Sequence, residues 1–247
     1  MFVTSDRAVL AVNVADARCD AREDVLLLHA GVTDQRSWHA LVQRLSLRRR
    51  CITFDERGFG ATTYEPEDGW SPVQDAVRVL HALDVAQCVV IGSSSGGQTA
   101  VDLALAHPDR VSALVLIAPA VRGAPYPSPT TRETQLEEDA ERAQQAGRLD
   151  EANELEAQLW LDGPTSRPGR VAGPARELFL EMNRKALSSP PRGPTAKPED
   201  AWPRLSHVTV PTRVLVGDLD VSDLQVISGQ LASELQSAEL IELPGVA

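Results

Sequence analysis

A serine flanked by glycines is the strongest chemical signal in the chain: Ser94 stands between Gly92 and Gly96 in the pattern G-x-S-x-G. The apolar run 88–91 precedes this pattern, and the alanine- and leucine-rich stretch 98–107 follows it. A sharp turn from a strand into a helix strains the backbone of its central residue, and small neighbours let that turn close. We therefore expect Ser94 to be an exposed nucleophile at a helix N-terminus, where developing negative charge is favoured. The alternative is a plain glycine-rich turn without chemistry.

Attack by a serine on a carbonyl also requires two N–H donors that hold the developing oxyanion. Ser95, the residue after the nucleophile, is expected to supply one of them. The other should come from the loop 30–32, which follows the apolar run 25–29, and Gly31 is our choice. We expect His29 to tie this loop down rather than to react.

A charged turn, which runs from Asp55 to Gly60, follows a further apolar run, 51–54. We expect Asp55 and Arg57 to be structural residues of this turn. A position for Asp55 at the entrance of the site is the alternative.

Short apolar runs rich in β-branched residues alternate with stretches of helical periodicity. The predicted strands are 9–14, 25–29, 51–54, 88–91, 111–117, 213–216 and 239–243, and the predicted helices between them include 37–47, 73–83 and 98–107. Runs that are apolar throughout are typical of strands buried on both faces of a parallel sheet. The alternation predicts an α/β fold, with a mostly parallel, twisted sheet covered by helices on both faces.

Residues 122–200 break this alternation, since proline clusters bracket them. Within this segment we expect two helices, 132–161 and 175–187, separated by residues 163–174. Residues 132–156 hold nine carboxylates against three arginines, which indicates a solvated helical face. We expect 1–121 and 201–247 to form one discontinuous core domain, and 122–200 to be a helical lid inserted over the sheet.

The composition excludes several classes of protein. The 247 residues carry a formal charge of −11, which argues against a nucleic-acid partner. No apolar run reaches the ~18 residues of a membrane span, and the N-terminus lacks the pattern of a signal peptide, so we expect a cytoplasmic protein. The three cysteines, Cys19, Cys51 and Cys88, argue against a disulfide framework and a zinc site. No metal or cofactor is implied, and the oligomeric state cannot be deduced.

Together these motifs resemble those of the α/β-hydrolase superfamily, in its lid-bearing, single-domain form. The matching segments are His29-Ala30-Gly31, the turn from Asp55 to Gly60, the serine turn from Gly92 to Gly97, His107-Pro108-Asp109-Arg110-Val111, and Val210-Pro211-Thr212 ahead of the 215–220 stretch. The resemblance covers nearly the whole chain. It departs from the family where Ala30 replaces the commoner glycine and where Ala61-Thr62-Thr63 replaces an ending with serine.

The resemblance implies a catalytic acid after the run 213–216, where Asp218, Asp220 and Asp223 lie. The family places the acid three residues after a glycine, which favours Asp220. Loop and helix N-terminal charge are the alternatives for Asp218 and Asp223. The family also places a histidine base after the last strand, one residue beyond the position of Ala247. None of the five histidines, which are His29, His39, His81, His107 and His207, matches that position. We therefore expect the histidine, and a final helix, beyond Ala247 in a chain cut short.

The function implied by the resemblance is that of a serine hydrolase acting on a small ester, lactone, thioester or amide. The substrate is expected to enter beneath the lid, against Val32, Trp160, Phe179 and Met182. For the three lid residues, packing between lid and sheet is an equally good interpretation. The same fold also hosts other activities. A non-catalytic ligand-binding protein, or an inactive fragment, is therefore the alternative function.

Overall fold

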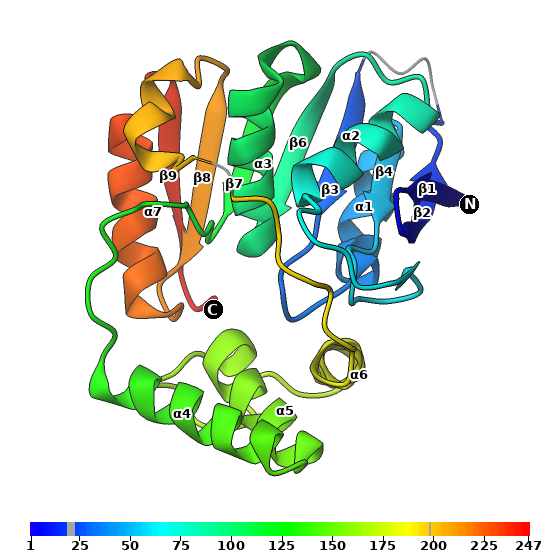
Figure 1. Ribbon diagram of the computed structural model, residues 1–247. Helices are drawn as coiled ribbons and strands as arrows, with labels where there is room; N and C mark the ends of the chain where they lie inside the picture. The colour runs from blue at the N-terminus through cyan, green and yellow to red at the C-terminus, as the bar shows by residue number, and fades with distance from the viewer. Residues whose placement is uncertain (19–22, 198) are drawn as a thin grey trace.

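The computed structural model describes residues 1–18, 23–197 and 199–247, and a single mixed sheet lies at its centre (Figure 1). Cys19 lies outside the described residues. The strands are β1 (Phe2–Ser5), β2 (Ala8–Ala15), β3 (Asp24–Leu28), β4 (Cys51–Phe54), β5 (Thr63–Tyr64), β6 (Cys88–Ser93), β7 (Val111–Ile117), β8 (Thr212–Gly217) and β9 (Ala238–Leu243). The seven strands predicted from the sequence are all among them.

The order of the strands brings the predicted site residues to one edge of the sheet. The sheet runs β1-β2-β4-β3-β6-β7-β8-β9, with β5 paired to β2. Along this order, the neighbouring strands β4, β3, β6, β7, β8 and β9 pair in parallel. By contrast, β2 pairs antiparallel with β1, β4 and β5. Parallel strands end at the same edge, which is where α/β proteins bind ligands. The loops after β3, β6 and β8 carry Gly31, Ser94 and Asp220 to that edge.

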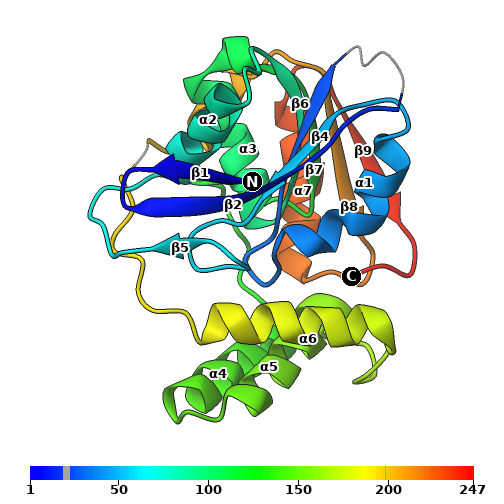
Figure 2. The ribbon, with the colours of Figure 1, turned by 90° about the vertical axis from the view of Figure 1, so that its right-hand side faces the viewer.

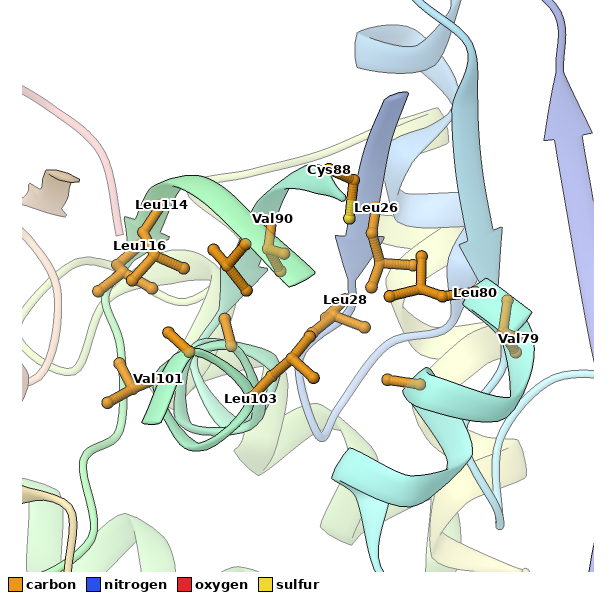
Figure 3. Close-up of a cluster of buried hydrophobic side chains, with 14 of the residues drawn as sticks. Leu26, Leu28, Val79, Leu80, Cys88, Val90, Val101, Leu103, Leu114 and Leu116 are labelled. Carbon is orange, nitrogen blue, oxygen red and sulfur yellow. The ribbon is translucent and has the colours of Figure 1, made fainter. Parts of the chain in front are cut away.

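Helices cover both faces of this sheet (Figures 1 and 2). The larger core lies beneath α2 (Pro72–Ala82), α3 (Ser95–Ala106) and α7 (Ser222–Glu234), and a smaller cluster lies beneath α1 (His39–Leu45). Figure 3 shows part of the larger core, in which side chains of β3, β6 and β7 meet α2 and α3: Leu26, Leu28, Val79, Leu80, Cys88, Val90, Val101, Leu103, Leu114 and Leu116. Among the described residues, no helix combines the length and apolar character needed to cross a membrane.

The inserted segment, residues 122–200, places three helices beyond the carboxyl edge of the sheet (Figures 1 and 2). They are α4 (Thr131–Gln145), α5 (Leu149–Ala157) and α6 (Pro174–Leu187). The single helix predicted over 132–161 is therefore wrong. Gly147 has a φ of +74°, which ends α4 in a tight turn before α5 begins. A short π-helix, Gln158–Asp162, then continues α5.

Candidate active site

The turn between β6 and α3 holds Ser94 in a backbone conformation that is rare outside glycine. Its φ is +51° and its ψ is −114°. The glycines on either side are required by close contacts. A Cβ on Gly92 would stand 2.3 Å from the carbonyl oxygen of Gly96, and a Cβ on Gly96 would stand 2.3 Å from that of Leu28. Such strain persists only where the surrounding structure enforces it, and it is typical of functional sites.

Two backbone N–H groups beside Ser94 are available to an oxyanion. Ser95 is the first residue of α3, so its N–H has no acceptor within the helix. A Cβ on Gly31 would stand 3.4 Å from Ser95 Oγ, which places the loop after β3 against this helix start. In the described part of the chain, no group accepts a hydrogen bond from the Gly31 N–H. The two predicted donors are thus neighbours.

His29 and Asp55 stabilise loops near Ser94 and do not line its cavity. His29 Nδ1 lies 2.8 Å from the Ala30 carbonyl oxygen, and its Nε2 accepts a hydrogen bond from the Glu56 N–H at 3.0 Å. Asp55 is buried, accepts the Ala61 N–H at 2.8 Å, and lines a separate hollow whose walls do not include Ser94. Both ring nitrogens of His29 are occupied, as a structural residue requires.

The loop after β8 distinguishes Asp220 from Asp218. Asp218 is exposed and accepts the Gly245 N–H at 2.6 Å. Asp220 lines the same cavity as Ser94 and is partly buried. Burial raises the pKa of Asp220 from 3.8 to about 6, although a hydrogen bond from the Val221 N–H opposes this rise. The carboxyl group in the cavity is therefore Asp220.

One cavity of about 320 Å³ joins most of the predicted site residues. Its walls are formed by Ala30, Gly31, Val32, Ser93, Ser94, Ser95, Ile117, Ala118, Trp160, Asp220, Leu224 and Ala247. The lining includes the hydroxyl groups of Ser93, Ser94 and Ser95 and the carboxyl group of Asp220, and apolar side chains form most of the remainder. The cavity can therefore hold a small carbonyl compound between the serine and an apolar wall.

Phe179 and Met182 do not belong to this cavity, although both were predicted to contact substrate. Both side chains are buried on α6, and neither contributes to the cavity wall. Met182 Sδ accepts a hydrogen bond from the Asp34 N–H at 3.4 Å, which joins α6 to the core. The packing interpretation therefore describes them better, while Val32 and Trp160 do line the cavity.

No histidine of the described residues lines the cavity, but Ala247 does. The residues before Ala247 are held against the loop that carries Asp220. The Leu219 N–H donates to the Val246 carbonyl oxygen at 2.9 Å, and a Cβ on Gly217 would stand only 2.1 Å from that oxygen. The peptide that follows β9 is thus directed to the space beside Ser94 and Asp220.

Glu133 is a buried contact between α4 and the core that was not singled out from the sequence. Its carboxylate accepts the Ser222 N–H at 2.6 Å and the Ser222 hydroxyl at 2.7 Å. It also accepts the Thr130 N–H at 2.6 Å. Burial alone would raise the pKa of Glu133, but these hydrogen bonds lower it. The signal that could have identified it is the capping pattern T-x-x-E from Thr130. Within the described ranges, no cluster of histidine, cysteine and carboxylate side chains could hold a metal ion.

Comparisons with known proteins identify relatives of similar sequence. A 2-hydroxymuconate semialdehyde hydrolase of Pseudomonas sp. (strain CF600) is 38% identical over 104 residues. That alignment covers 39% of this chain and 36% of the relative, so the chain spans little more than a third of the relative's length. Karrikin insensitive 2 receptor B of Petunia hybrida is 25% identical over 233 residues, covering 89% of this chain and 81% of the receptor.

Solved structures share the fold over almost the whole chain. A hydrolase from Pseudomonas aeruginosa PA01 superposes with a TM-score of 0.76 at 24% identity, covering 98% of this chain and 89% of that one. A thermophilic esterase from Thermogutta terrifontis also gives a TM-score of 0.76, at 21% identity, covering 100% of this chain and 90% of that one. The sequence model of the alpha/beta hydrolase family matches residues 25–247. The chain therefore belongs to the alpha/beta hydrolase family.

Proposed function

We propose that the protein is a serine hydrolase with Ser94 as nucleophile and Asp220 as the acid of its catalytic group. The observation that carries this proposal is the shared cavity, in which the strained Ser94 lies with Gly31, Ser95 and Asp220. A strained serine, two available N–H donors and a partly buried carboxyl group are the parts that acyl transfer needs. Family membership supports the same reaction class.

The proposed reaction proceeds through an acyl-enzyme. Ser94 Oγ attacks the substrate carbonyl carbon while its proton passes to a base. The carbonyl oxygen becomes an oxyanion held by the Ser95 and Gly31 N–H groups. Collapse of this intermediate expels the leaving group, which takes the proton from the base. Water then attacks the acyl group with the same base as proton acceptor, which releases the acid and restores the serine.

The base in this proposal is a histidine that follows Ala247, with Asp220 orienting its ring. This part is supported by the position of Ala247 in the cavity wall beside Ser94 and Asp220. General-base assistance typically accelerates such a step by about 10²–10⁴-fold. Imidazole in solution should replace part of this function, because the cavity leaves room for a small ring.

We propose a small ester, lactone, thioester or amide as substrate. The cavity volume of about 320 Å³ lies at the small end of ligand pockets, so a bulky substrate does not fit. Val32, Ile117, Trp160 and Leu224 contribute an apolar wall, which suits a short hydrocarbon portion. The enol-lactonase from Burkholderia xenovorans LB400, at a TM-score of 0.70 and 23% identity, shares the fold alone.

Hydrolysis of p-nitrophenyl acetate and butyrate with and without imidazole tests this proposal. We expect imidazole to increase turnover in a saturable way, and we expect Ser94→Ala to abolish that increase. Ser93→Ala is the competing variant, because Ser93 is the other hydroxyl in the cavity that precedes the helix. Loss of turnover only in Ser93→Ala would identify Ser93, and not Ser94, as the nucleophile. An equal imidazole effect in parent and Ser94→Ala would refute the proposal.

A ligand-binding protein without turnover is the second candidate. The observation that favours it is that no histidine side chain of the described residues reaches the cavity. Among the relatives, one of those with long coverage is named as a receptor. Turnover by a chain with a histidine appended after Ala247 separates the two. Saturable binding of an ester that is recovered intact from that chain supports the binding protein.

A further inference from the structure

Several contacts between the inserted segment and the core lie around Asp220 and the peptide that follows β9. Glu133 of α4 binds Ser222, directly after the acid loop. A Cβ on Gly163 would stand 2.5 Å from the Leu219 carbonyl oxygen, so the end of the π-helix packs on the same loop. Arg170 reaches the peptide that follows β9. The position of the inserted segment is thus tied to the residues around Asp220 and Ala247.

Arg170 links three backbone carbonyl groups from two distant parts of the chain. Its Nε donates to the Asp162 carbonyl oxygen at 2.5 Å, and one terminal nitrogen donates to that of Leu161 at 3.0 Å. The other terminal nitrogen donates to the Gly245 carbonyl oxygen at 3.0 Å. A guanidinium group is planar and presents its donors in a fixed fork, so one side chain can hold all three acceptors at once.

Asp162 fixes the loop from which Arg170 extends. The Asp162 side chain is fully buried, and its carboxylate accepts the Gly169 N–H at 2.7 Å and the Val171 N–H at 2.9 Å. Arg176 donates to the same carboxylate at 2.9 Å. The residues on both sides of Arg170 are therefore held by a buried charge. The contacts of Asp162, and not the contact with Gly245 alone, therefore position the guanidinium group of Arg170.

The contact with Gly245 has a direct relation to the cavity. Trp160, which lines the cavity, belongs to the π-helix whose last carbonyl groups Arg170 binds. Gly245 lies two residues before Ala247, which lines the same cavity. One side chain thus joins the wall contributed by the inserted segment to the segment beside Ser94.

We propose that Arg170 is a positioning residue that holds the peptide after β9, and with it the base of the reaction, in place beside Ser94. This inference rests on the proposed function for the identity of the base. The contact itself is independent of that function. When Arg170 releases Gly245, the inserted segment and the peptide 244–247 move independently, and the base loses its alignment.

Hydrogen exchange on the chain as it exists tests the positioning role without any need for activity. The Leu219 N–H, which donates to Val246, and the Gly245 N–H, which donates to Asp218, report on the peptide 244–247. We expect Arg170→Met to accelerate their exchange by about 10-fold or more, since local opening requires little free energy. The Thr212 N–H at the far end of β8 should keep its exchange rate. Unchanged exchange at Leu219 and Gly245 would overturn the proposal.

Two further variants separate positioning from general loss of structure. Arg170→Lys keeps the charge but cannot hold three carbonyl groups, so we expect an intermediate increase in exchange. Arg167→Met removes a neighbouring exposed arginine and should change neither rate. If Arg170→Met fails to fold, Arg170→Lys decides: exchange equal to the parent at Leu219 and Gly245 overturns the proposal, and a selective increase supports it.

Kinetics in a chain with a histidine appended after Ala247 test whether the contact between Arg170 and Gly245 affects the reaction. We expect Arg170→Met to lower kcat about 10-fold with little change in KM, because alignment of the base is lost while the cavity remains. Arg170→Lys should recover part of kcat. An increase in KM alone would contradict a role in positioning the base. Faster exchange in Arg170→Met, together with no activity in the histidine-extended chain that keeps Arg170, would refute the proposed function. The role of the contact in holding the peptide 244–247 would still be supported.

Discussion

The rigidity of the site originates in a few atoms around Ser94. Its positive φ is enforced by Gly92 and Gly96, whose missing side chains let β6, α3 and the loop after β3 approach closely. The atoms that a Cβ on Gly96 would meet are backbone carbonyl oxygens, which cannot move aside as a side chain can. The same close approach brings Gly31 next to Ser95. Geometry at one glycine thus sets the positions of both the proposed nucleophile and the proposed oxyanion donors.

Gly96→Ala tests this steric argument. A Cβ would lie 2.3 Å from the Leu28 carbonyl oxygen and 2.6 Å from that of His29. We expect a loss of about 3 kcal/mol or more in the free energy of unfolding, measured by urea denaturation. Gly229→Ala is the matched control, because its Cβ would meet nothing within 4 Å inside α7. The control should gain about 0.5–1 kcal/mol. Equal stability of the two variants would contradict the argument.

Asp220→Asn tests the environment of the carboxyl group. Since burial raises the pKa of Asp220 to about 6, the folded state binds this proton more tightly than the unfolded state does. The ionised carboxylate therefore destabilises the fold increasingly as the pH rises from about 4 through 6, and below that range it does not. We expect Asp220→Asn to raise the free energy of unfolding by about 1–2 kcal/mol near pH 8, and by little near pH 4.

Urea denaturation at the two pH values measures this difference, with Asp218→Asn as control. Asp218 is exposed and holds the Gly245 N–H, so its replacement should bring no gain at either pH. A less stable Asp220→Asn variant near pH 8 would show that the carboxylate is stabilised instead. In a chain with a histidine appended after Ala247, Ser94-dependent turnover should decline as the pH falls through about 6, because the ionised carboxylate is the form that orients the base.

At this scale, local spacing was enough to predict that Ser94, Ser95 and Gly31 lie together, and they do line one cavity. Their proposed roles depend on one turn and one neighbouring loop, and short-range patterns describe both. Asp220 required the family resemblance, because three carboxylates lie close together and only the folded loop shows which one faces the serine. The sequence could not separate the lid residues that line the cavity from those that pack against the core. An apolar side chain on a helix looks the same in the sequence whether it packs or lines a cavity.

Among the secondary-structure elements, α4 and α7 are joined at their N-terminal ends by the carboxylate of Glu133. Glu133 satisfies N–H groups at the start of both helices, where the backbone lacks internal acceptors. Its negative charge also suits the positive ends of two helix dipoles. This contact fixes the inserted segment beside the loop that carries Asp220.

Glu133→Gln should weaken that connection. Its carboxylate accepts from Ser222 and Thr130, and an amide cannot satisfy all of these donors. We expect a loss of about 1–3 kcal/mol in the free energy of unfolding near pH 7. Glu138→Gln on the same helix is the control, because Glu138 is exposed and, among the described residues, pairs at the surface with Arg142 alone. That variant should be indistinguishable from the parent. A Glu133→Gln variant as stable as this control would contradict the account.

The pH dependence of the Glu133 contact follows from its lowered pKa. The stabilisation is fully present above the ordinary value of 4.5 and is lost as the pH falls through the lowered value. Two carboxylates near Glu133, on Glu137 and Asp223, have raised pKa values because burial and their negative neighbours favour protonation. Glu137 protonates before Glu133, because its pKa is raised from the same ordinary value from which that of Glu133 is lowered, and this relieves its repulsion on Glu133. Denaturation at several acid pH values should therefore show the difference between parent and Glu133→Gln shrinking only as the pH falls below the ordinary value of 4.5.

The strands were predictable because buried parallel strands require continuous apolar runs. The break between α4 and α5 was not, since acidic helical stretches lie on both sides of Gly147 and its positive φ is seen only in the structure. Contacts between distant segments were equally hidden. Glu133 and Ser222 lie 89 residues apart, and Arg170 and Gly245 lie 75 residues apart. No periodicity in the sequence links such pairs.

In the whole molecule, the sheet and the inserted segment meet at the carboxyl edge of the sheet. The helices α4–α6 lie beyond the carboxyl ends of the strands, and the last residues of the chain lie near them (Figure 1). The cavity is thus enclosed by parts that are distant in sequence. They are the segments at the ends of β3, β6 and β7, the loop after β8 with the start of α7, the π-helix with Trp160, and the peptide that ends at Ala247. Rigid loops hold Ser94, and the long-range contacts align the rest.

The most direct test of the central claim is the turnover of a p-nitrophenyl ester by two extended chains. One carries a histidine appended after Ala247, and the other carries an alanine there. The account predicts that the histidine chain is faster by about 100-fold or more, and that Ser94→Ala removes this difference. Equal rates for the two extended chains, or a histidine chain that keeps its rate after Ser94→Ala, would contradict it.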